Sequence, residues 1–162
     1  MKFLCGVGVV AAMLSSSAVC TRAADYVEGE FAKSRAYSAG VMTEGGRVLW
    51  MAGQTALKDE NGNDLTGKFD AQVRAIFKEM DKTLKKAGGT LANVVNVTIF
   101  LNDPRYGERM ADLRREAFPD GKWPGSTMIT VSNFAQPGML VEIAGIAVIG
   151  DRCSNSNPCL PR

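Results

Sequence analysis

Pro124-Gly125-Ser126-Thr127-Met128-Ile129, followed after a loop by Leu140-Val141-Glu142-Ile143, is the stretch that decides the fold of this chain. Two short runs with apolar residues flank a loop that contains Gly and Pro, which is the pattern of two strands joined by an irregular connection. One carboxylate, Glu142, interrupts the second run. Because charged side chains are seldom set among hydrophobes, Glu142 becomes a candidate functional residue.

Upstream of this block, strand-like and helix-like patterns alternate. Residues 37–41 and 48–53 read as strands around the turn at residues 43–46, which predicts a β-hairpin. Apolar residues recur at helical spacing in residues 70–87, and the pair Gly88-Gly89 ends that helix.

The second half of the chain continues the alternation. A β-branched run over residues 94–101 predicts a strand, and an apolar stripe then predicts a helix that ends near residues 118–121. The stripe consists of Tyr106, Met110, Leu113 and Ala117. Strands near 126–132 and 140–149 complete the order β-β-α-β-α-β-β, which predicts an α+β fold with both helices on one face of a mixed sheet.

The sheet face away from the helices also needs cover. The residues that we assign to this face are more apolar than a solvated sheet face should be: Trp50, Val95, Val97, Ile99 and Ile146. A contiguous apolar patch on a small domain favours self-association, so we predict an oligomer.

The N-terminal residues have the three zones of a secretory signal peptide. Lys2 precedes an apolar run from Phe3 to Leu14, and small residues follow. We therefore assign residues 1–24 to a signal peptide, 25–150 to one domain and 151–162 to a C-terminal tail. The predicted location is periplasmic or secreted, with no membrane attachment after cleavage.

The charge of the predicted mature chain argues against nucleic acid as a partner. The whole chain has a formal charge of +2, and removing residues 1–24 removes Lys2 and Arg22 but no acidic residue, which leaves zero. A neutral chain lacks the basic surface that attracts a phosphate backbone.

The cysteine and histidine content limits the chemistry. Cys153 and Cys159 are the two cysteines outside the leader, and in an exported chain we favour a disulfide between them over a metal site or free thiols. The chain has no histidine, which excludes histidine-based triads and histidine-ligated zinc. We expect no metal and no cofactor.

Together these patterns resemble the RidA/YjgF family of reactive-intermediate imine deaminases. The C-terminal signature matches at Pro124, Gly125, Glu142 and Ile143, and the strand at residues 94–101 is similar to the family's central strand. The resemblance covers about residues 36–149. It implies the chorismate-mutase-like fold, assembled as a homotrimer with small-molecule clefts between subunits.

Carried over by position, the resemblance also implies a set of site residues. Glu142 and Tyr37 are the catalytic candidates, with Glu142 orienting water. The substrate-binding candidates are Gly53, Asp112, Ser126 and Met128. Simpler structural roles stay open: an ion-paired glutamate at Glu142, a packing tyrosine at Tyr37 and a solvated helix face at Asp112.

The signature departs from the family pattern at the residue that binds the substrate carboxylate. Ser126 stands where the family has an arginine, and serine cannot give the two parallel charge-assisted hydrogen bonds of a guanidinium. Met128 and Asp112 replace residues that are usually cysteine and asparagine. We therefore expect a neutral or cationic ligand, unless Arg109, Arg114 or Arg115 reaches the cleft.

These observations predict an exported Rid-like small-molecule hydrolase or deaminase homologue, with Glu142-oriented water acting on an imine, an enamine or a related ligand. The usual carboxylate-bearing imine is disfavoured by Ser126. The alternative is a non-catalytic trimer that binds a small ligand or a protein on the same scaffold. An endoribonuclease is the least supported reading because the charge is neutral.

Overall fold

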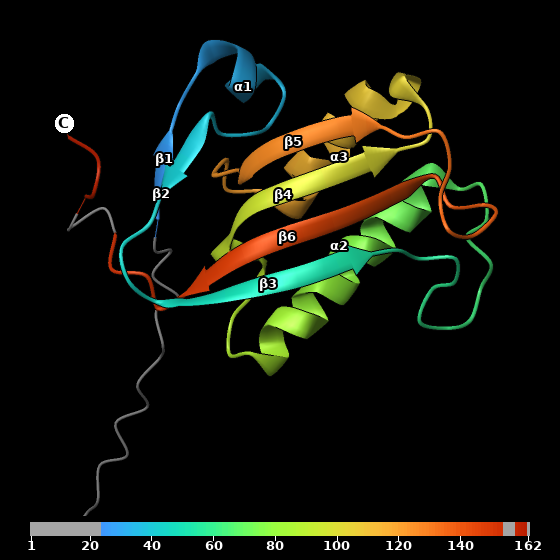
Figure 1. Cartoon of the computed structure of the whole chain (residues 1–162), viewed down its shortest axis with the longest axis horizontal. Coiled ribbons are helices and arrows are strands. Elements are labelled where there is room, and N and C mark those ends of the chain that lie inside the picture. Colours follow the sequence, from blue (N-terminus) through green and yellow to red (C-terminus); the bar gives the residue numbers. More distant parts are fainter. Residues whose placement is uncertain (1–23, 154–157, 162) are drawn as a thin grey trace, which may run out of the picture.

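The computed structural model describes residues 24–153 and 158–161, and its centre is a four-stranded sheet (Figure 1). The strands stand in the order β3-β6-β4-β5, where β4 and β5 are parallel and the other neighbours are antiparallel. From β3 onward, the helices and strands follow one another along the chain as β3 (Arg47–Gln54), α2 (Phe69–Lys86), η1 (Leu91–Asn93), β4 (Val94–Leu101), η2 (Pro104–Tyr106), α3 (Gly107–Ala117), β5 (Gly125–Thr130) and β6 (Val141–Ile149). The predicted α+β class, with a mixed sheet and two main helices, is confirmed.

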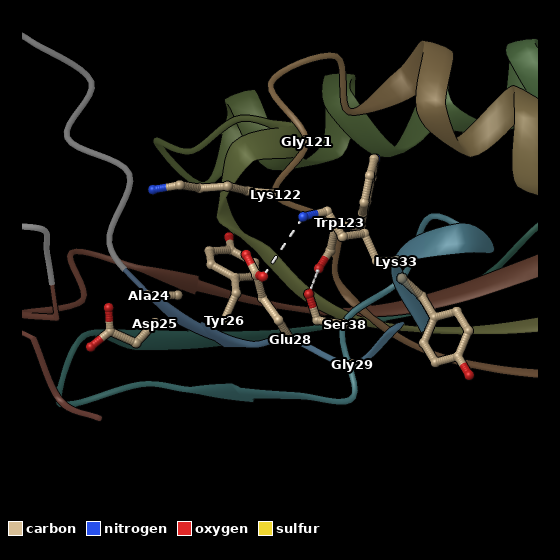
Figure 2. Close-up of a pocket in the computed structure, with 11 residues that line it drawn as sticks. Ala24, Asp25, Tyr26, Glu28, Gly29, Lys33, Ser38, Gly121, Lys122 and Trp123 are labelled. Atoms are coloured by element: carbon tan, nitrogen blue, oxygen red, sulfur yellow. Dashed lines mark hydrogen bonds and ion pairs between the residues drawn. The ribbon is translucent and has the colours of Figure 1, made fainter. Parts of the chain in front are cut away.

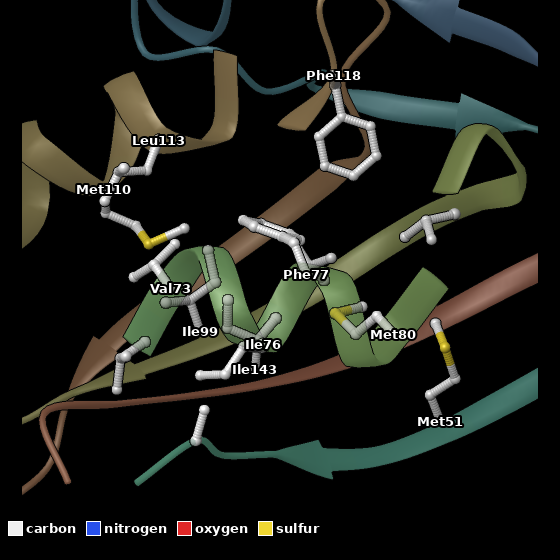
Figure 3. Close-up of a cluster of buried hydrophobic side chains, with 14 of the residues drawn as sticks. Met51, Val73, Ile76, Phe77, Met80, Ile99, Met110, Leu113, Phe118 and Ile143 are labelled. Carbon is white, nitrogen blue, oxygen red and sulfur yellow. The ribbon is translucent and has the colours of Figure 1, made fainter. Parts of the chain in front are cut away.

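The core lies between the sheet and the helices α2 and α3 (Figure 3). Side chains of α2 at helical spacing, including Val73, Ile76 and Met80, are fully buried against it. The helix ends where Gly88 takes a φ of 83° and Gly89 N–H donates to the carbonyl of Leu84 over 2.9 Å. This is a Schellman cap, and it explains why the glycine pair ends the helix.

The alternation of side chains along β4 decides which sheet residues face the helices. Val97 and Ile99 point into the core and are fully buried, so their assignment to the uncovered face is wrong. Trp50 does lie on the uncovered face, opposite Ile146 on β6, and its side chain is 75% exposed. The register of the strands, which periodicity alone does not supply, makes the difference.

The predicted hairpin between residues 37–41 and 48–53 is also wrong. The strand β2 (Gly40–Met42) pairs with β1 (Asp25–Val27) in a separate two-stranded sheet, while β3 pairs with β6. A short helix, α1 (Glu30–Ser34), connects β1 to β2. The described chain thus begins with a β-α-β segment before the main sheet. Its first two elements, β1 and α1, were not predicted from the sequence.

The turn expected to close the hairpin is instead fastened to the C-terminal tail. Glu44 N–H donates to Asp151 Oδ1 over 3.0 Å, and the carbonyl of Glu44 accepts from the N–H of Arg152 over 2.9 Å. A Cβ on Gly46 would lie 2.8 Å from Val148, so close packing on β6 requires glycine there. The Gly-Gly pair thus serves packing and positive φ angles rather than a hairpin turn.

The tail itself is held at both ends. Cys153 and Cys159 form a disulfide, as predicted. Beyond it, Leu160 N–H donates to Asp25 Oδ2 on β1 over 3.1 Å. The predicted signal peptide lies outside the described residues, except for Ala24. In residues 24–153 and 158–161, no helix is long and apolar enough to cross a membrane.

Candidate functional site

Arg114 is the side chain that organises the first part of the site. It lies on α3, four residues after the buried Met110, and its side chain reaches the start of β5. Its Nη1 donates to Ser126 Oγ over 2.5 Å, and its Nη2 donates to the carbonyl of Arg35 over 2.7 Å. The guanidinium also lies 5.7 Å from the ring centroid of Tyr37. A guanidinium therefore lies against Ser126, the position where the resemblance noted from the sequence implies an arginine.

A hollow of about 230 Å³ opens beside these groups. Its lining combines a buried cation, a hydroxyl and apolar side chains: Phe31, Arg35, Tyr37, Arg114, Ser126 and Met128. Three of the predicted site residues, Tyr37, Ser126 and Met128, are therefore brought together. We name this the Arg114 hollow.

The charge of Arg114 is buried and not balanced by a carboxylate. The residue is 2% exposed, its Nε has no hydrogen-bond partner, and no acidic side chain in the described part of the chain forms an ion pair with it. Burial, followed by the nearby positive charge of Arg35, lowers the pKa of Arg114 to about 10, so it stays protonated at neutral pH. By contrast, Arg109 on the same helix pairs with Asp70, which raises the pKa of Arg109.

Glu142 lies in a different place, on the sheet face away from the helices. Its neighbours along β6, Val141 and Ile143, are buried in the core, so the alternation of the strand turns Glu142 to the other face, beside Phe100. The described residues give it no hydrogen bond or ion pair. It lines a separate hollow of about 230 Å³ with Phe100, Val131, Asn133, Phe134 and Ala135, which we name the Glu142 hollow.

Gly53 makes room for the Glu142 side chain. A Cβ added to Gly53 would lie 2.7 Å from Glu142 Cδ and would overlap its Oε1. Two of the predicted site residues thus touch each other across β3 and β6. The absence of a side chain at Gly53 lets the carboxylate lie flat on the strand.

Asp112 joins neither hollow. It lies exposed on α3, where it accepts a 2.7 Å hydrogen bond from Arg115 and lies 3.7 Å from Arg109. Its surroundings match the solvated helix face that the sequence left open as an alternative. The six predicted residues therefore form two groups on opposite sheet faces plus one outlier, and one chain does not assemble them into one cleft.

A further hollow, of about 210 Å³, lies between the β1–α1 segment and residues 121–123 (Figure 2). It is lined by groups of both charge signs, including Asp25, Glu28 and Lys33, and Lys33 lies 3.8 Å from Glu28. Ser38 Oγ donates to the carbonyl of Trp123 over 2.6 Å and closes one wall. Because acidic and basic groups face one another there, this hollow has no preference for an ion of either sign.

In residues 24–153 and 158–161, no group of three or more acidic or cysteine side chains is placed to hold a metal ion. The residues of the Arg114 hollow that sequence reasoning missed are Phe31 and Arg35, whereas Arg114 was one of three arginines named as able to reach the cleft. Phe31 lies on α1, which the sequence did not predict. Arg114 has a signal in the sequence, since it follows Met110 by four residues and so falls on the buried side of its helix.

Comparison with known proteins now places the fold. The sequence pattern of the family described as Endoribonuclease L-PSP matches residues 27–149. The chain belongs to the RidA/YjgF/L-PSP (Rid) family. It is similar to a RutC family protein of Pyrococcus abyssi, at 28% identity over 102 residues, which are 63% of this chain and 79% of the relative. Protein mmf2 of Schizosaccharomyces pombe, a mitochondrial protein, is 31% identical over 104 residues, covering 63% and 80% of the two chains.

Solved structures agree with this membership. A Rid family protein of unknown function from Yersinia pestis, YyfB, covers 78% of this chain and 98% of its own, with a TM-score of 0.69 and 22% identity. A member of the YjgF/YER057c/UK114 family from Mycobacterium tuberculosis covers 78% and 100%, with a TM-score of 0.55 and 28% identity. Both show the Rid fold that the sequence predicts.

Proposed function

We propose that this Rid family member is an exported small-molecule hydrolase of the deaminase type, in which Glu142 orients the attacking water. One observation carries the proposal: Glu142 is a half-buried carboxylate with no protein partner among the described residues, lying over Gly53 at the edge of a hollow. An unpaired carboxylate in such a place accepts a hydrogen bond from water and can take its proton.

The proposed reaction is hydrolysis of an imine, or of an enamine that tautomerises to it. The oxygen of water adds to the carbon of the C=N bond, and the proton released passes through Glu142 to the nitrogen. The hydroxyl proton of this addition product then passes to the nitrogen as the C–N bond breaks, which gives a carbonyl compound and ammonia. Tyr37, with its hydroxyl, is the proposed hydrogen-bond donor that holds the substrate.

A homotrimer with the ligand between subunits is part of the proposal. Trp50 and Ile129 are exposed on the face of the sheet that the helices leave uncovered, and such an apolar face favours a second chain. The Arg114 hollow and the Glu142 hollow lie on opposite faces of one sheet, so a shared cleft requires residues from two chains. Light scattering coupled to size exclusion tests this assembly, and a monomer at micromolar concentration would contradict it.

The separation of the two hollows also favours the second candidate function, a non-catalytic module that binds a small ligand or a protein. The proposed export rests on the sequence of residues 1–24, and the Cys153–Cys159 disulfide supports it because disulfides persist in oxidising compartments. Sequencing the N-terminus of the protein recovered from the periplasm or the medium tests the export.

Ammonia release decides between the two functions. Freshly generated 2-iminobutanoate and a neutral aliphatic imine are incubated with the mature protein, with Glu142→Gln and with a matched control, Glu116→Gln. Glu116 is an exposed carboxylate paired with Arg74 on the helical side of the molecule. Turnover by wild type and control that falls at least about 100-fold in Glu142→Gln supports the enzyme. Equal rates in all three proteins and in buffer would leave the binding module as the function.

A further inference from the structure

We propose that Gln72 is a positioning residue for the Glu142 hollow. Its buried side-chain amide holds the end of the loop at residues 131–140 and the backbone that leads into Glu142. The inference rests on the proposed function and deepens it, because it names the group that keeps the water-orienting carboxylate and the wall beside it in place. Gln72 does not line the hollow, so it acts there through the backbone that it binds.

The first argument is that both polar atoms of the Gln72 side chain are bound to backbone. Gln72 lies in the first turn of α2 and is 1% exposed. Its Nε2 donates to the carbonyl of Leu65 over 2.9 Å and to that of Gly138 over 2.8 Å. Its Oε1 accepts from the N–H of Leu140 over 2.9 Å. A buried amide is costly unless its hydrogen bonds are made, and here they are. We name these three bonds the Gln72 clasp.

The second argument is the place of the clasped segment between the two parts of the hollow. Leu140 directly precedes β6, and Glu142 follows it by two residues. In the other direction along the chain, the loop carries the side chains that line the hollow beside Glu142: Val131, Asn133, Phe134 and Ala135. Figure 1 shows this loop, between β5 and β6, next to the segment that enters α2, where Gly67 N–H donates to the carbonyl of Gly138 over 3.2 Å. A shift of residues 138–140 would therefore move the carboxylate and the loop wall together.

The third argument is that few other bonds hold the loop. The N–H of Val131 fixes its start, through a 2.8 Å hydrogen bond to the last residue of β4. Residues 132–137 are exposed, except for the half-buried Phe134. In the part of the chain that the structure describes, their one hydrogen bond is a long one, of 3.5 Å, accepted from the N–H of Met139. A segment with so few bonds opens easily, so the position of its far end depends on the Gln72 clasp.

A purely structural role for Gln72 must be separated from this one, and Asn93 offers the matched control. Its Oδ1 accepts from the N–H of Thr90 over 2.9 Å, and its Nδ2 donates to the carbonyl of Val148 over 3.3 Å. Asn93 is thus a second side-chain amide that binds the backbone of β6, but at the end of the strand away from Glu142. Asn93→Leu removes these bonds and leaves the Gln72 clasp intact.

The test compares wild type, Gln72→Met and Asn93→Leu by NMR and by ammonia release. Methionine has a similar shape to glutamine, so Gln72→Met removes the three bonds without leaving a large cavity. We expect it to shift the carboxyl ¹³C signal of Glu142 and the ring signals of Phe134, and to speed amide exchange at Leu140 at least about 10-fold. Its kcat and kcat/KM should fall together, by about 10-fold or more, because the water is misplaced in the transition state. Asn93→Leu should leave these signals and rates unchanged.

Wild type alone provides one test, which holds even where Gln72→Met does not fold. The amide of Leu140 should exchange at least about 100-fold more slowly than that of Asn133 in the exposed part of the loop. Equal exchange rates at these two amides would overturn the inference, because the Gln72 clasp would then be open as often as the loop.

The variants separate the remaining outcomes. Unchanged signals of Glu142 and Phe134 in folded Gln72→Met would show that Gln72 only stabilises the fold, and equal shifts in Asn93→Leu would show that any loosening of β6 has this effect. Either result would overturn the inference. Shifted signals confined to Gln72→Met, without ammonia release by wild type, would refute the proposed hydrolase but leave the positioning role standing. Ammonia release that Gln72→Met leaves unchanged would do the reverse.

Discussion

The substitution Gly53→Ala tests whether the position of Glu142 matters, because it moves that carboxylate without altering it. The new Cβ would lie 2.7 Å from Glu142 Cδ and 3.0 Å from its Cγ, so the glutamate side chain must rotate away. Since the clashing atoms belong to a flexible side chain, we expect a loss of stability of only about 1 kcal/mol. In the proposed reaction the displaced carboxylate would no longer orient water, and a misplacement of about 1 Å can cost about 100-fold in rate.

The assay compares kcat for ammonia release and the free energy of unfolding in urea. Gly40→Ala is the control, because its Cβ would meet Val27 at an ordinary distance of 3.6 Å. Carboxyl ¹³C NMR of Glu142 reports the displacement independently of turnover. A Gly53→Ala protein with kcat within about twofold of wild type, despite a shifted Glu142 resonance, would refute the reasoning that water is held at this carboxylate.

Three further predictions concern stability. Ser126→Arg alone brings a second guanidinium against the buried Arg114, and we expect it to lower the free energy of unfolding by about 2–4 kcal/mol in urea titrations; an unchanged value would mean that the new side chain escapes the hollow. Hydrogen bonds from Arg109 lower the pKa of Asp70, so Asp70 binds its proton less tightly in the folded protein than in the unfolded chain. The ionised pair therefore stabilises the fold above about pH 4, and this stabilisation is lost as the pH falls through the pKa of Asp70 in the folded protein. Because the pair is partly exposed, Asp70→Asn should lose about 1 kcal/mol or less at pH 7 and less than that at pH 2, and equal losses at both pH values would contradict the linkage. Replacing both Cys153 and Cys159 by Ser should lower the free energy of unfolding by about 2 kcal/mol, because the loop that the disulfide closes is short. A change of less than about 0.5 kcal/mol would mean that the hydrogen bonds accepted by Asp151 and Asp25 hold the tail in place without the disulfide.

The main sheet and the helices packed on it could be predicted from the sequence because the signals for these elements are local. The apolar stripe of α2, the β-branched run of β4 and the glycine pair after α2 each specify their element within a few residues. The segments β1 and α1, with three and five residues, are too short to show a period. β2 pairs with β1, which the sequence did not predict, and the turn after β2 is anchored to the tail through Glu44 and Asp151, which are far apart in sequence.

The candidate site was accessible only in part. Glu142 could be found because a carboxylate in an apolar run is visible locally, and Ser126 because a signature residue is replaced. Arg114 and Ser126 are 12 residues apart and belong to different elements, so their contact requires the packing of α3 on β5. The face to which Glu142 points follows from the strand register, which separates it from the hollow that contains Tyr37.

The placement of Arg114 and Glu142 on opposite faces of one sheet has a genetic and biochemical consequence. If neighbouring chains share each catalytic centre, an Arg114→Gln chain and a Glu142→Gln chain are each defective in a different half of it. Mixed assemblies of the two inactive proteins would then contain some interfaces with both intact halves. Such chains would complement each other in the test tube and in a cell that expresses both, whereas a centre built within one chain would stay inactive in every mixture.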